Sequence, residues 1–177
     1  MKKLLGEERR NELLTILKQK REPITGTELA KFANVSRQVI VNDMTLLKAR
    51  NEPILATSQG YLYMAKDNAE KQVERIIACY HPRDQTKDEL LTLVDCGVTV
   101  NNVIVQHPIY GEITASIMVS NRHDVENFIH QVEKTNAKNL AELTDGIHLH
   151  TITAPTSTIL DRAEQLMRKK GYLVEEK

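Results

Sequence analysis

Apolar residues in the first part of the chain recur at the spacing of α-helices. Between Glu7 and Lys20 the leucine and isoleucine side chains gather on one face of the expected helix and charged residues cover the rest; Pro23 follows the end of this stretch. A second helix is expected to begin at Thr25, because Thr25 and Glu28 have the spacing of a capping box. The pattern predicts two helices before a turn at residues 33–35.

A third helix is predicted to open at Ser36, a residue type favoured at helix N-caps. Ile40, Met44 and Leu47 recur at helical spacing and are expected to face the core, which leaves another face to solvent. That exposed face is rich in side chains that can bond two atoms of a base edge, as the N-terminal residues of a recognition helix do. A packing module with a polar face for solubility would show the same pattern. The candidate DNA-contacting residues of this helix are Arg37, Gln38, Val41, Asn42 and Thr45.

Two short strand-like runs, residues 54–57 and 61–64, follow the third helix and predict a hairpin. A wing in this position could contact the neighbouring groove or phosphates through Ser58, Gln59 and Lys48. The order of three helices and a wing resembles the helix-turn-helix domain of the biotin-repressor type. The likeness covers TGTELAKFANVSRQVIVNDMTLLKARN, residues 25–51, and implies that residues 1–64 bind double-stranded operator DNA.

The remaining chain alternates strand and helix patterns. Residues 65–72 are polar and are expected to form a linker. Strands are predicted at 73–80, 98–106, 113–119 and 147–153, and helices at 84–95, 121–134 and 157–170. The order β-α-β-β-α-β is that of a ferredoxin-like α/β-sandwich. The predicted fold is therefore α+β, with a winged helix-turn-helix over 1–64 and a regulatory domain over 73–177.

Charge is unevenly divided along the chain, although the 177 residues carry no net charge. Residues 1–50 contain eleven Lys or Arg and six Asp or Glu, a net of +5, and the rest carries −5. A basic part joined to an acidic part suits a polyanion-binding module fused to another domain, although a solvated basic face would give the same count. No apolar run approaches the roughly 20 residues that cross a bilayer, so a cytoplasmic protein without membrane contact is expected. Cys79 and Cys96 form no Cys-x-x-Cys pair and are expected to be reduced thiols.

Histidines in the second part suggest a metal site. His148 and His150 are two residues apart on a predicted strand, so both point to one face, with Cα atoms about 6.5 to 7 Å apart. The first and fourth strands of a ferredoxin-like sheet are neighbours, which brings His81 near the same place, with Glu89 one turn into the following helix. Three imidazoles and a carboxylate suit zinc, nickel or iron. Alternatively, His-x-His is a surface pair and Glu89 completes a capping box with Thr86.

The chain as a whole resembles the bacterial nicotinic-acid-responsive repressors, whose regulatory part is the three-histidine domain. The matching stretches are His81 with Glu89 eight residues later, VIVQHPIYGEI at 103–113, and GIHLHTITAP at 146–155. The resemblance implies a divalent metal held by residues matching His81, Glu89, His148 and His150. It also implies that the domain binds nicotinic acid and that His107 and Tyr110 belong to the pocket wall.

The resulting hypothesis is a homodimeric repressor that takes nicotinic acid as co-repressor and controls genes of niacin uptake and NAD biosynthesis. Paired recognition helices would read successive half-sites on the duplex. Two alternatives remain open from the sequence. One is a regulator in which the metal itself is the signal, and the other is a metal-dependent hydrolase that uses the site to activate water.

Overall fold

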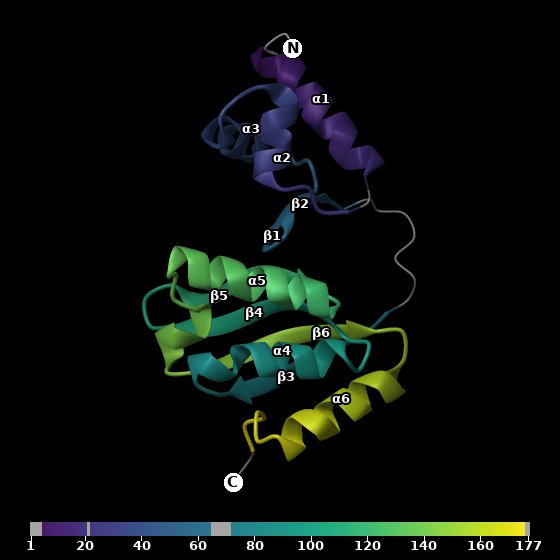
Figure 1. The fold of residues 1–177 in the computed structure, drawn as a ribbon, viewed down its shortest axis with the longest axis vertical. Helices are drawn as coiled ribbons and strands as arrows, with labels where there is room; N and C mark the ends of the chain where they lie inside the picture. The colour runs from purple at the N-terminus through teal and green to yellow at the C-terminus, as the bar shows by residue number, and fades with distance from the viewer. Residues whose placement is uncertain (1–4, 21, 65–71, 176–177) are drawn as a thin grey trace. The chain divides into compact units, whose positions relative to one another are not determined.

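The chain forms two compact units, Met1–Asn68 and Ala69–Lys177, in the computed structural model, which describes residues 5–20, 22–64 and 72–175 (Figure 1). Each unit has its own hydrophobic core. The predicted linker, 65–72, lies outside the described residues except for Gln72, so the domain boundaries 1–64 and 73–177 stay a prediction. Within the described ranges, no helix is both long and apolar enough to span a membrane.

The first unit consists of three helices and a two-stranded hairpin, as predicted. The elements are α1 (Gly6–Gln19), α2 (Gly26–Ala33), α3 (Arg37–Ala49), β1 (Ile54–Thr57) and β2 (Gly60–Tyr63). The capping box is confirmed, because the Thr25 hydroxyl accepts from the Glu28 amide and the Glu28 carboxylate accepts from the Thr25 amide. Ser36 caps α3 by accepting from the Val39 amide. These caps satisfy amides that would otherwise lack partners at the helix starts.

The core of the first unit collects the apolar faces of the helices. Ile40, Met44 and Leu47 of α3 are all buried, as the spacing predicts. Asp43 of the same helix is also buried, and its carboxylate accepts from Arg9 at 2.6 Å and from Arg10 at 3.3 Å. Pairing with two guanidinium groups offsets the cost of burying this charge. These ion pairs fix α3 against α1.

The second unit contains a four-stranded antiparallel sheet, three α-helices and two 3₁₀ helices. In chain order the elements are β3 (Val73–Tyr80), η1 (Arg83–Gln85), α4 (Thr86–Val94), β4 (Thr99–His107), β5 (Gly111–Val119), α5 (Arg122–Thr135), η2 (Leu140–Thr144), β6 (Ile147–Ala154) and α6 (Ser157–Lys169). The predicted order of strands and helices is confirmed. The 3₁₀ helix η2 has no counterpart in the sequence interpretation, and after α6 the chain meets the sheet through an isolated bridge between Cys79 and Leu173.

The strand order refines the predicted sandwich. The α+β class is confirmed, and the first and fourth strands of the unit, β3 and β6, are neighbours as expected. However, the order is β3-β6-β4-β5, which places the first strand at an edge, whereas a ferredoxin-like sandwich has its first and third strands in the centre. Both orders are antiparallel. The apolar alternation does not distinguish whether the β4–β5 hairpin joins the sheet through its first or its second strand.

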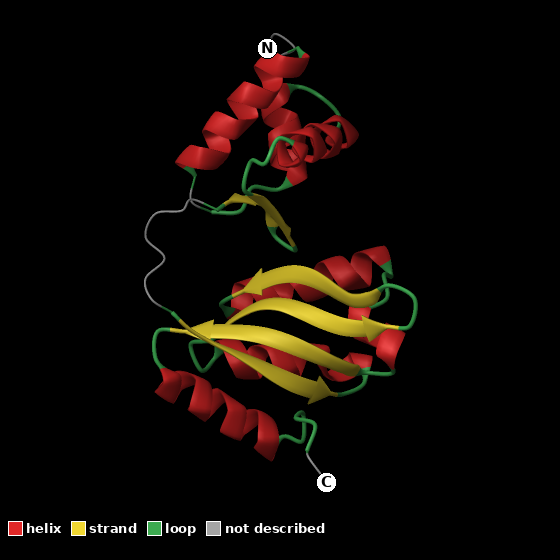
Figure 2. Ribbon diagram, turned by 180° about the vertical axis from the view of Figure 1, so that it is seen from behind, coloured by secondary structure: helices red, strands yellow, loops and turns green. Residues whose placement is uncertain are grey.

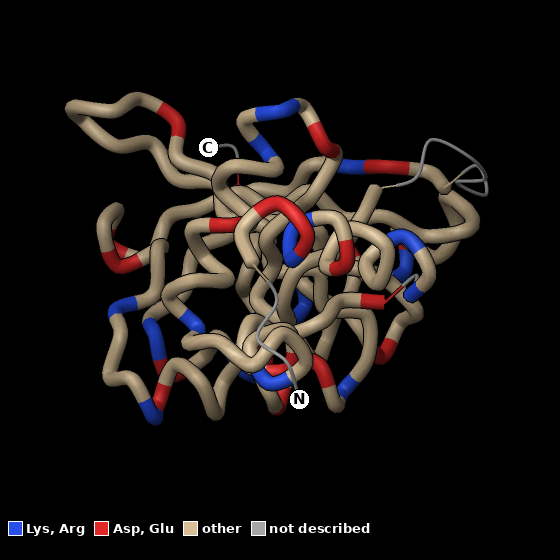
Figure 3. The backbone as a smooth tube through the Cα atoms, turned by 90° about the horizontal axis from the view of Figure 1, so that it is seen from above, with Lys and Arg blue, Asp and Glu red and all other residues tan. Residues whose placement is uncertain are grey.

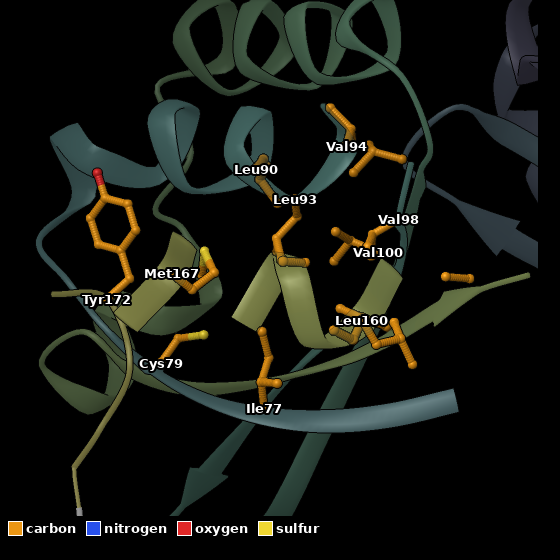
Figure 4. Close-up of a cluster of buried hydrophobic side chains, with 14 of the residues drawn as sticks. Ile77, Cys79, Leu90, Leu93, Val94, Val98, Val100, Leu160, Met167 and Tyr172 are labelled. Carbon is orange, nitrogen blue, oxygen red and sulfur yellow. The ribbon is translucent and has the colours of Figure 1, made fainter. Parts of the chain in front are cut away.

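The helices of the second unit lie on one face of the sheet (Figures 1 and 2). α4 and α5 cover this face, and α6 packs beside β3 and α4. Side chains from α4, α6 and the sheet meet in one buried cluster, in which Leu93, Leu160 and Ile77 are labelled in Figure 4. The opposite face of the sheet carries no helix among the described residues (Figure 2).

Basic and acidic residues are interspersed along the backbone, as Figure 3 shows. Several pairs form ion pairs within a unit. Arg75 of β3 binds Asp161 and Glu164 of α6 at 2.7 and 2.8 Å, and Lys170 binds Asp88 at 2.7 Å. Such exposed pairs hold the last helix in place but contribute little stability each.

Candidate functional site

The four predicted metal ligands meet in the second unit. His81 directly follows β3, Glu89 is the fourth residue of α4, and His148 and His150 lie on β6. The nearest carboxylate oxygen of Glu89 is 2.7 Å from Nε2 of His81, 3.2 Å from that of His148 and 3.4 Å from that of His150. None of the four residues is more than 3% exposed. Residues from three separate segments thus form one buried polar cluster.

The alternative reading of Glu89 as a capping residue is wrong. Gln85 occupies the N-cap of α4, and Thr86 is already the first residue of the helix. The Thr86 hydroxyl accepts from the Asn139 side chain at 3.1 Å. The Glu89 carboxylate instead points to the three imidazoles. The surface-pair reading of His148 and His150 also fails, because both side chains are buried.

Each imidazole is oriented by a backbone carbonyl at its second ring nitrogen. Nδ1 of His81 lies 2.8 Å from the Pro82 oxygen, Nδ1 of His148 lies 2.9 Å from the Gly146 oxygen, and Nδ1 of His150 lies 2.7 Å from the Asn102 oxygen. A carbonyl only accepts, so each Nδ1 must carry a proton. A neutral ring then presents the lone pair of Nε2 to Glu89.

The Nε2 lone pairs of three neutral imidazoles and one carboxylate therefore converge on one point. A cation at this point would stabilise the arrangement. Protonation of the rings can supply the positive charge, and so can a metal ion. The donor set of three nitrogens and one oxygen suits zinc, nickel or iron. Backbone carbonyls that hold the far nitrogen of each ring are the usual support of metal-binding histidines. The residues fit a divalent transition metal.

The electrostatics of the cluster follow from its burial. Burial opposes the charge of Glu89, but the charge of His150 and hydrogen bonds from the imidazoles outweigh it and hold the pKa of Glu89 well below its ordinary value. Burial lowers the pKa of His81 and of His150, but their interactions with Glu89 exceed this effect, so both pKa values are raised. The Glu89 carboxylate is thus ionised, and its charge attracts cations to the centre of the cluster.

Gly146 sets the positions of two imidazoles. Its carbonyl accepts from Nδ1 of His148 and from the His81 amide at 3.4 Å. Its φ is +93°, and a Cβ atom at this position would lie 2.5 Å from the His81 oxygen. Only glycine combines this backbone conformation with so close an approach.

Sequence reasoning missed Cys79 as a neighbour of the cluster. Its thiol lies within 4.8 Å of ligand atoms of Glu89 and His148, on the buried side of β3. Burial raises the pKa of Cys79, and the Glu89 charge raises it further, so the group is a thiol in the metal-free site. The register could have indicated this position, because Cys79 pairs with His148 across the sheet.

A pocket opens beside the cluster, with a volume of about 380 Å³ that includes space open to solvent. Its wall combines three of the imidazoles and Glu89 with mainly apolar side chains. These come from α4, from the two strands of the β4–β5 hairpin, from α5 and from η2: Leu90, Val103, Ile117, Phe128, Leu140 and Ala141. Thr86 and Asn139 are its further polar lining residues. The pocket suits a small, largely apolar ring with a polar group directed at the imidazoles.

The structure does not bring His107 and Tyr110 to this pocket. Both belong to the β4–β5 hairpin, and neither is among the residues that line the cavity. Nδ1 of His107 accepts from the amides of Ile109 and Tyr110, so the ring stabilises the hairpin turn. Tyr110 is 75% exposed and lies against the His107 ring.

The predicted DNA-contacting residues of α3 share an accessible face. Arg37, Gln38, Asn42, Thr45 and Lys48 are exposed, and Val41 is half-buried. The Gln38 side chain donates to the Asn42 side chain at 3.3 Å, so these two amides present one hydrogen-bonding edge. Arg37 lies against Gly26, near the Tyr61 ring of the wing. The side chains of Arg37 and Tyr61 each come within 3.6 Å of the position that a Cβ atom on Gly26 would occupy. The wing residues Ser58 and Gln59 are half-buried in the turn between β1 and β2.

Known proteins resemble this chain over its whole length. A model of the 3H domain matches residues 74–176, and a model of an HTH domain matches residues 9–62. The chain is 53% identical over 175 residues to "Transcription repressor NadR" of Bacillus subtilis (strain 168), covering 98% of this chain and 97% of that protein. It is 38% identical over 174 residues to "Probable transcription repressor NiaR" of Thermotoga maritima, covering 98% of each.

Proposed function

The chain belongs to the family of transcription repressors that join an HTH domain to a 3H domain, and we propose that it represses transcription in response to nicotinic acid. The observation that carries the ligand proposal is the pocket beside the buried cluster of His81, Glu89, His148 and His150. Nicotinic acid has a flat ring for the apolar wall and two polar groups, its ring nitrogen and its carboxylate, for the cluster.

A divalent transition metal is the proposed cofactor. His81, Glu89, His148 and His150 would hold it, and as a Lewis acid it would bind the carboxylate or ring nitrogen of the ligand. The anchored Nδ1 atoms support this proposal, because they leave three Nε2 lone pairs available. Leu90 and Phe128 would exclude water from one side of the bound ring.

Operator DNA is the proposed partner of the first unit. Arg37, Gln38 and Asn42 would read base edges from the major groove, with Val41 and Thr45 beside them. Lys48, Ser58 and Gln59 would contact phosphates or the neighbouring groove. The exposure of the α3 face and the cap at its start support this assignment.

A homodimer is the proposed form on DNA, since one module of this size seldom supplies enough specificity. The open face of the sheet in the second unit is a suitable dimer surface. Ile76, Tyr80 and Ile147 lie on it with 59%, 54% and 55% of their surface exposed. Nicotinic acid would favour the dimer arrangement that spaces the recognition helices correctly, and the coupling equals its differential affinity for the two arrangements.

Three measurements on the purified full chain test this function. Elemental analysis after dialysis should find one metal equivalent per chain. Titration calorimetry should then show binding of nicotinic acid but not of nicotinamide, and gel shifts on candidate operators should show tighter DNA binding with the acid. The double variant His148→Ala/His150→Ala should lose metal and ligand. His123→Ala, which removes an exposed histidine of α5, should keep both.

The outcomes separate the rival functions. If metal removal changes the affinity for DNA and nicotinic acid does not, the protein is a metal-responsive regulator. If nicotinic acid leaves the affinity for DNA unchanged at every concentration, the co-repressor proposal is refuted. The whole-length relatives are named as transcription repressors, which argues against the hydrolase hypothesis.

A further inference from the structure

The middle of β4 contains an irregularity next to the metal cluster. β4 pairs with β6 as Val100 with Ile152 and then as Asn102 with Thr151, so Asn101 is an extra residue on β4. The same place is irregular in the pairing of β4 with β5. An extra residue of this kind is a β-bulge, and bulges often redirect a group at a functional site.

The bulge changes which side chains of β4 face the helices. Alternate residues of a regular strand point to opposite faces, so Val100 and Val103 would lie on opposite sides. With the extra residue both face the helices, where Val100 is in the core and Val103 lines the pocket beside His150. The bulge is thus required for the pocket wall.

Asn102 is bonded to β6 through two different oxygens. Its backbone carbonyl accepts from Nδ1 of His150 at 2.7 Å, and its side-chain Oδ1 accepts from the Thr151 amide at 3.0 Å. Thr151 is the residue paired with Asn102, so its amide would ordinarily bond to the Asn102 carbonyl. The side chain therefore takes the sheet hydrogen bond and leaves the carbonyl for the imidazole.

We infer that Asn102 is a positioning residue for His150, and that its side-chain amide is what frees the carbonyl that fixes the proton of His150 on Nδ1. With a side chain that has no acceptor, the Thr151 amide would compete with His150 for the Asn102 carbonyl. The contact that aims Nε2 of His150 at Glu89 would then weaken. This inference rests on the proposed metal site, but it concerns a hydrogen bond that exists without the metal.

Asn101 provides a matched control within the same bulge. Its side chain accepts from the Thr153 hydroxyl at 3.2 Å, so it also bridges β4 to β6. No imidazole of the cluster is among its described partners. Asn101→Ala therefore tests the general effect of weakening the bulge, and Asn102→Ala tests the specific effect on His150.

The experiment measures Co²⁺ affinity of the full-length protein by competition with a chelator. Asn102→Ala should weaken Co²⁺ binding about 10- to 100-fold and alter the visible spectrum of the bound ion, as loss of a group that orients a ligand does. Asn102→Asp, which keeps an acceptor oxygen, and Asn101→Ala should retain most of the affinity. Equal weakening in Asn101→Ala and Asn102→Ala, or wild-type affinity in Asn102→Ala, would overturn the inference.

Nitrogen NMR of labelled histidine gives a second readout that does not depend on metal. In the metal-free wild type, at a pH where the ring is neutral, His150 should carry its proton on Nδ1, and this preference should disappear in Asn102→Ala. A wild-type proton on Nε2 would overturn the inference even if Asn102→Ala did not fold. Failure of the wild type to bind Co²⁺ while this proton is found on Nδ1 would refute the proposed metal site and leave the role of Asn102 supported.

Discussion

The two units place their functional residues in opposite environments. In the first unit six of the eight candidate DNA-contacting residues lie on one helix, within twelve positions from Arg37 to Lys48, and the other two, Ser58 and Gln59, lie in the turn of the wing. In the second unit the candidate metal ligands are buried and come from three segments, from His81 to His150. A surface that reads a polyanion must meet water and its partner directly. A site that binds a small cation gains strength from exclusion of water, because charges interact more strongly in a low dielectric.

The units also differ in how they use a buried carboxylate. Asp43 pairs with two arginines and joins two helices, while Glu89 faces three imidazoles that can exchange protons or hold a metal. Guanidinium groups remain charged at all ordinary pH, so Asp43 faces two fixed positive charges. The charge around Glu89 can be supplied by different cations. The first arrangement is suited to support, and the second to binding.

The largest expected effect comes from removing the buried carboxylate of the first unit. Asp43→Ala removes the buried carboxylate that Arg9 and Arg10 share and should lower the free energy of unfolding of this unit by about 3 kcal/mol, as breaking a buried ion pair does. Asp161→Ala breaks an exposed pair with Arg75 and should cost no more than about 1 kcal/mol. Chemical denaturation, with hydrogen exchange to locate the loss, measures both. Equal losses would show that the burial of Asp43 has no special role.

Substitution of Gly146 tests whether metal binding by the second unit depends on the backbone geometry of the site. Gly146→Ala and Gly111→Ala both place a side chain at positive φ, which costs about 1–2 kcal/mol. Only at Gly146 would the new Cβ also meet the His81 carbonyl. Metal affinity should therefore fall about 10- to 100-fold in Gly146→Ala alone. Chelator competition measures this, and an equal fall in Gly111→Ala would mean that strain anywhere in the sheet suffices.

Two substitutions on α3 should separate base reading from phosphate contact. Asn42→Ala should reduce discrimination between operator and altered sequences by about 1–3 kcal/mol at the base pair that it reads. Lys48→Ala should weaken binding to all sequences alike and reduce the salt dependence by about one counterion. Fluorescence anisotropy over a salt series distinguishes the two. Loss of discrimination in Lys48→Ala would place the reading face further along the helix.

The smallest effect is expected at the β4–β5 hairpin. Tyr110→Ala removes an exposed ring outside the pocket, so the affinity for nicotinic acid measured by calorimetry should not change. Phe128→Ala, which opens the pocket wall, is the matched comparison and should weaken binding. A clear loss in Tyr110→Ala would indicate that the hairpin reaches the pocket of a second chain.

The local features of this protein follow from its amino-acid sequence alone. Helix starts at Thr25 and Ser36, the buried face of α3 and the order of strands and helices all depend on contacts between residues close in the chain. Spacing also placed His148 and His150 on one face, because alternation along a strand needs no tertiary information.

The way in which distant segments combine depends on the tertiary fold. The strand order, the bulge at Asn101 and Asn102, and the packing of η2 over the pocket arise from pairings between residues up to about half the chain apart. The pattern of apolar and polar residues along the chain is nearly the same for either strand order. It therefore cannot reveal the strand order, the bulge or the position of η2. The same holds for His107, which the family resemblance assigned to the pocket wall and whose ring accepts hydrogen bonds within its own turn. Local periodicity fixes which residues are buried, but the partner that each one meets depends on how the whole sheet is assembled.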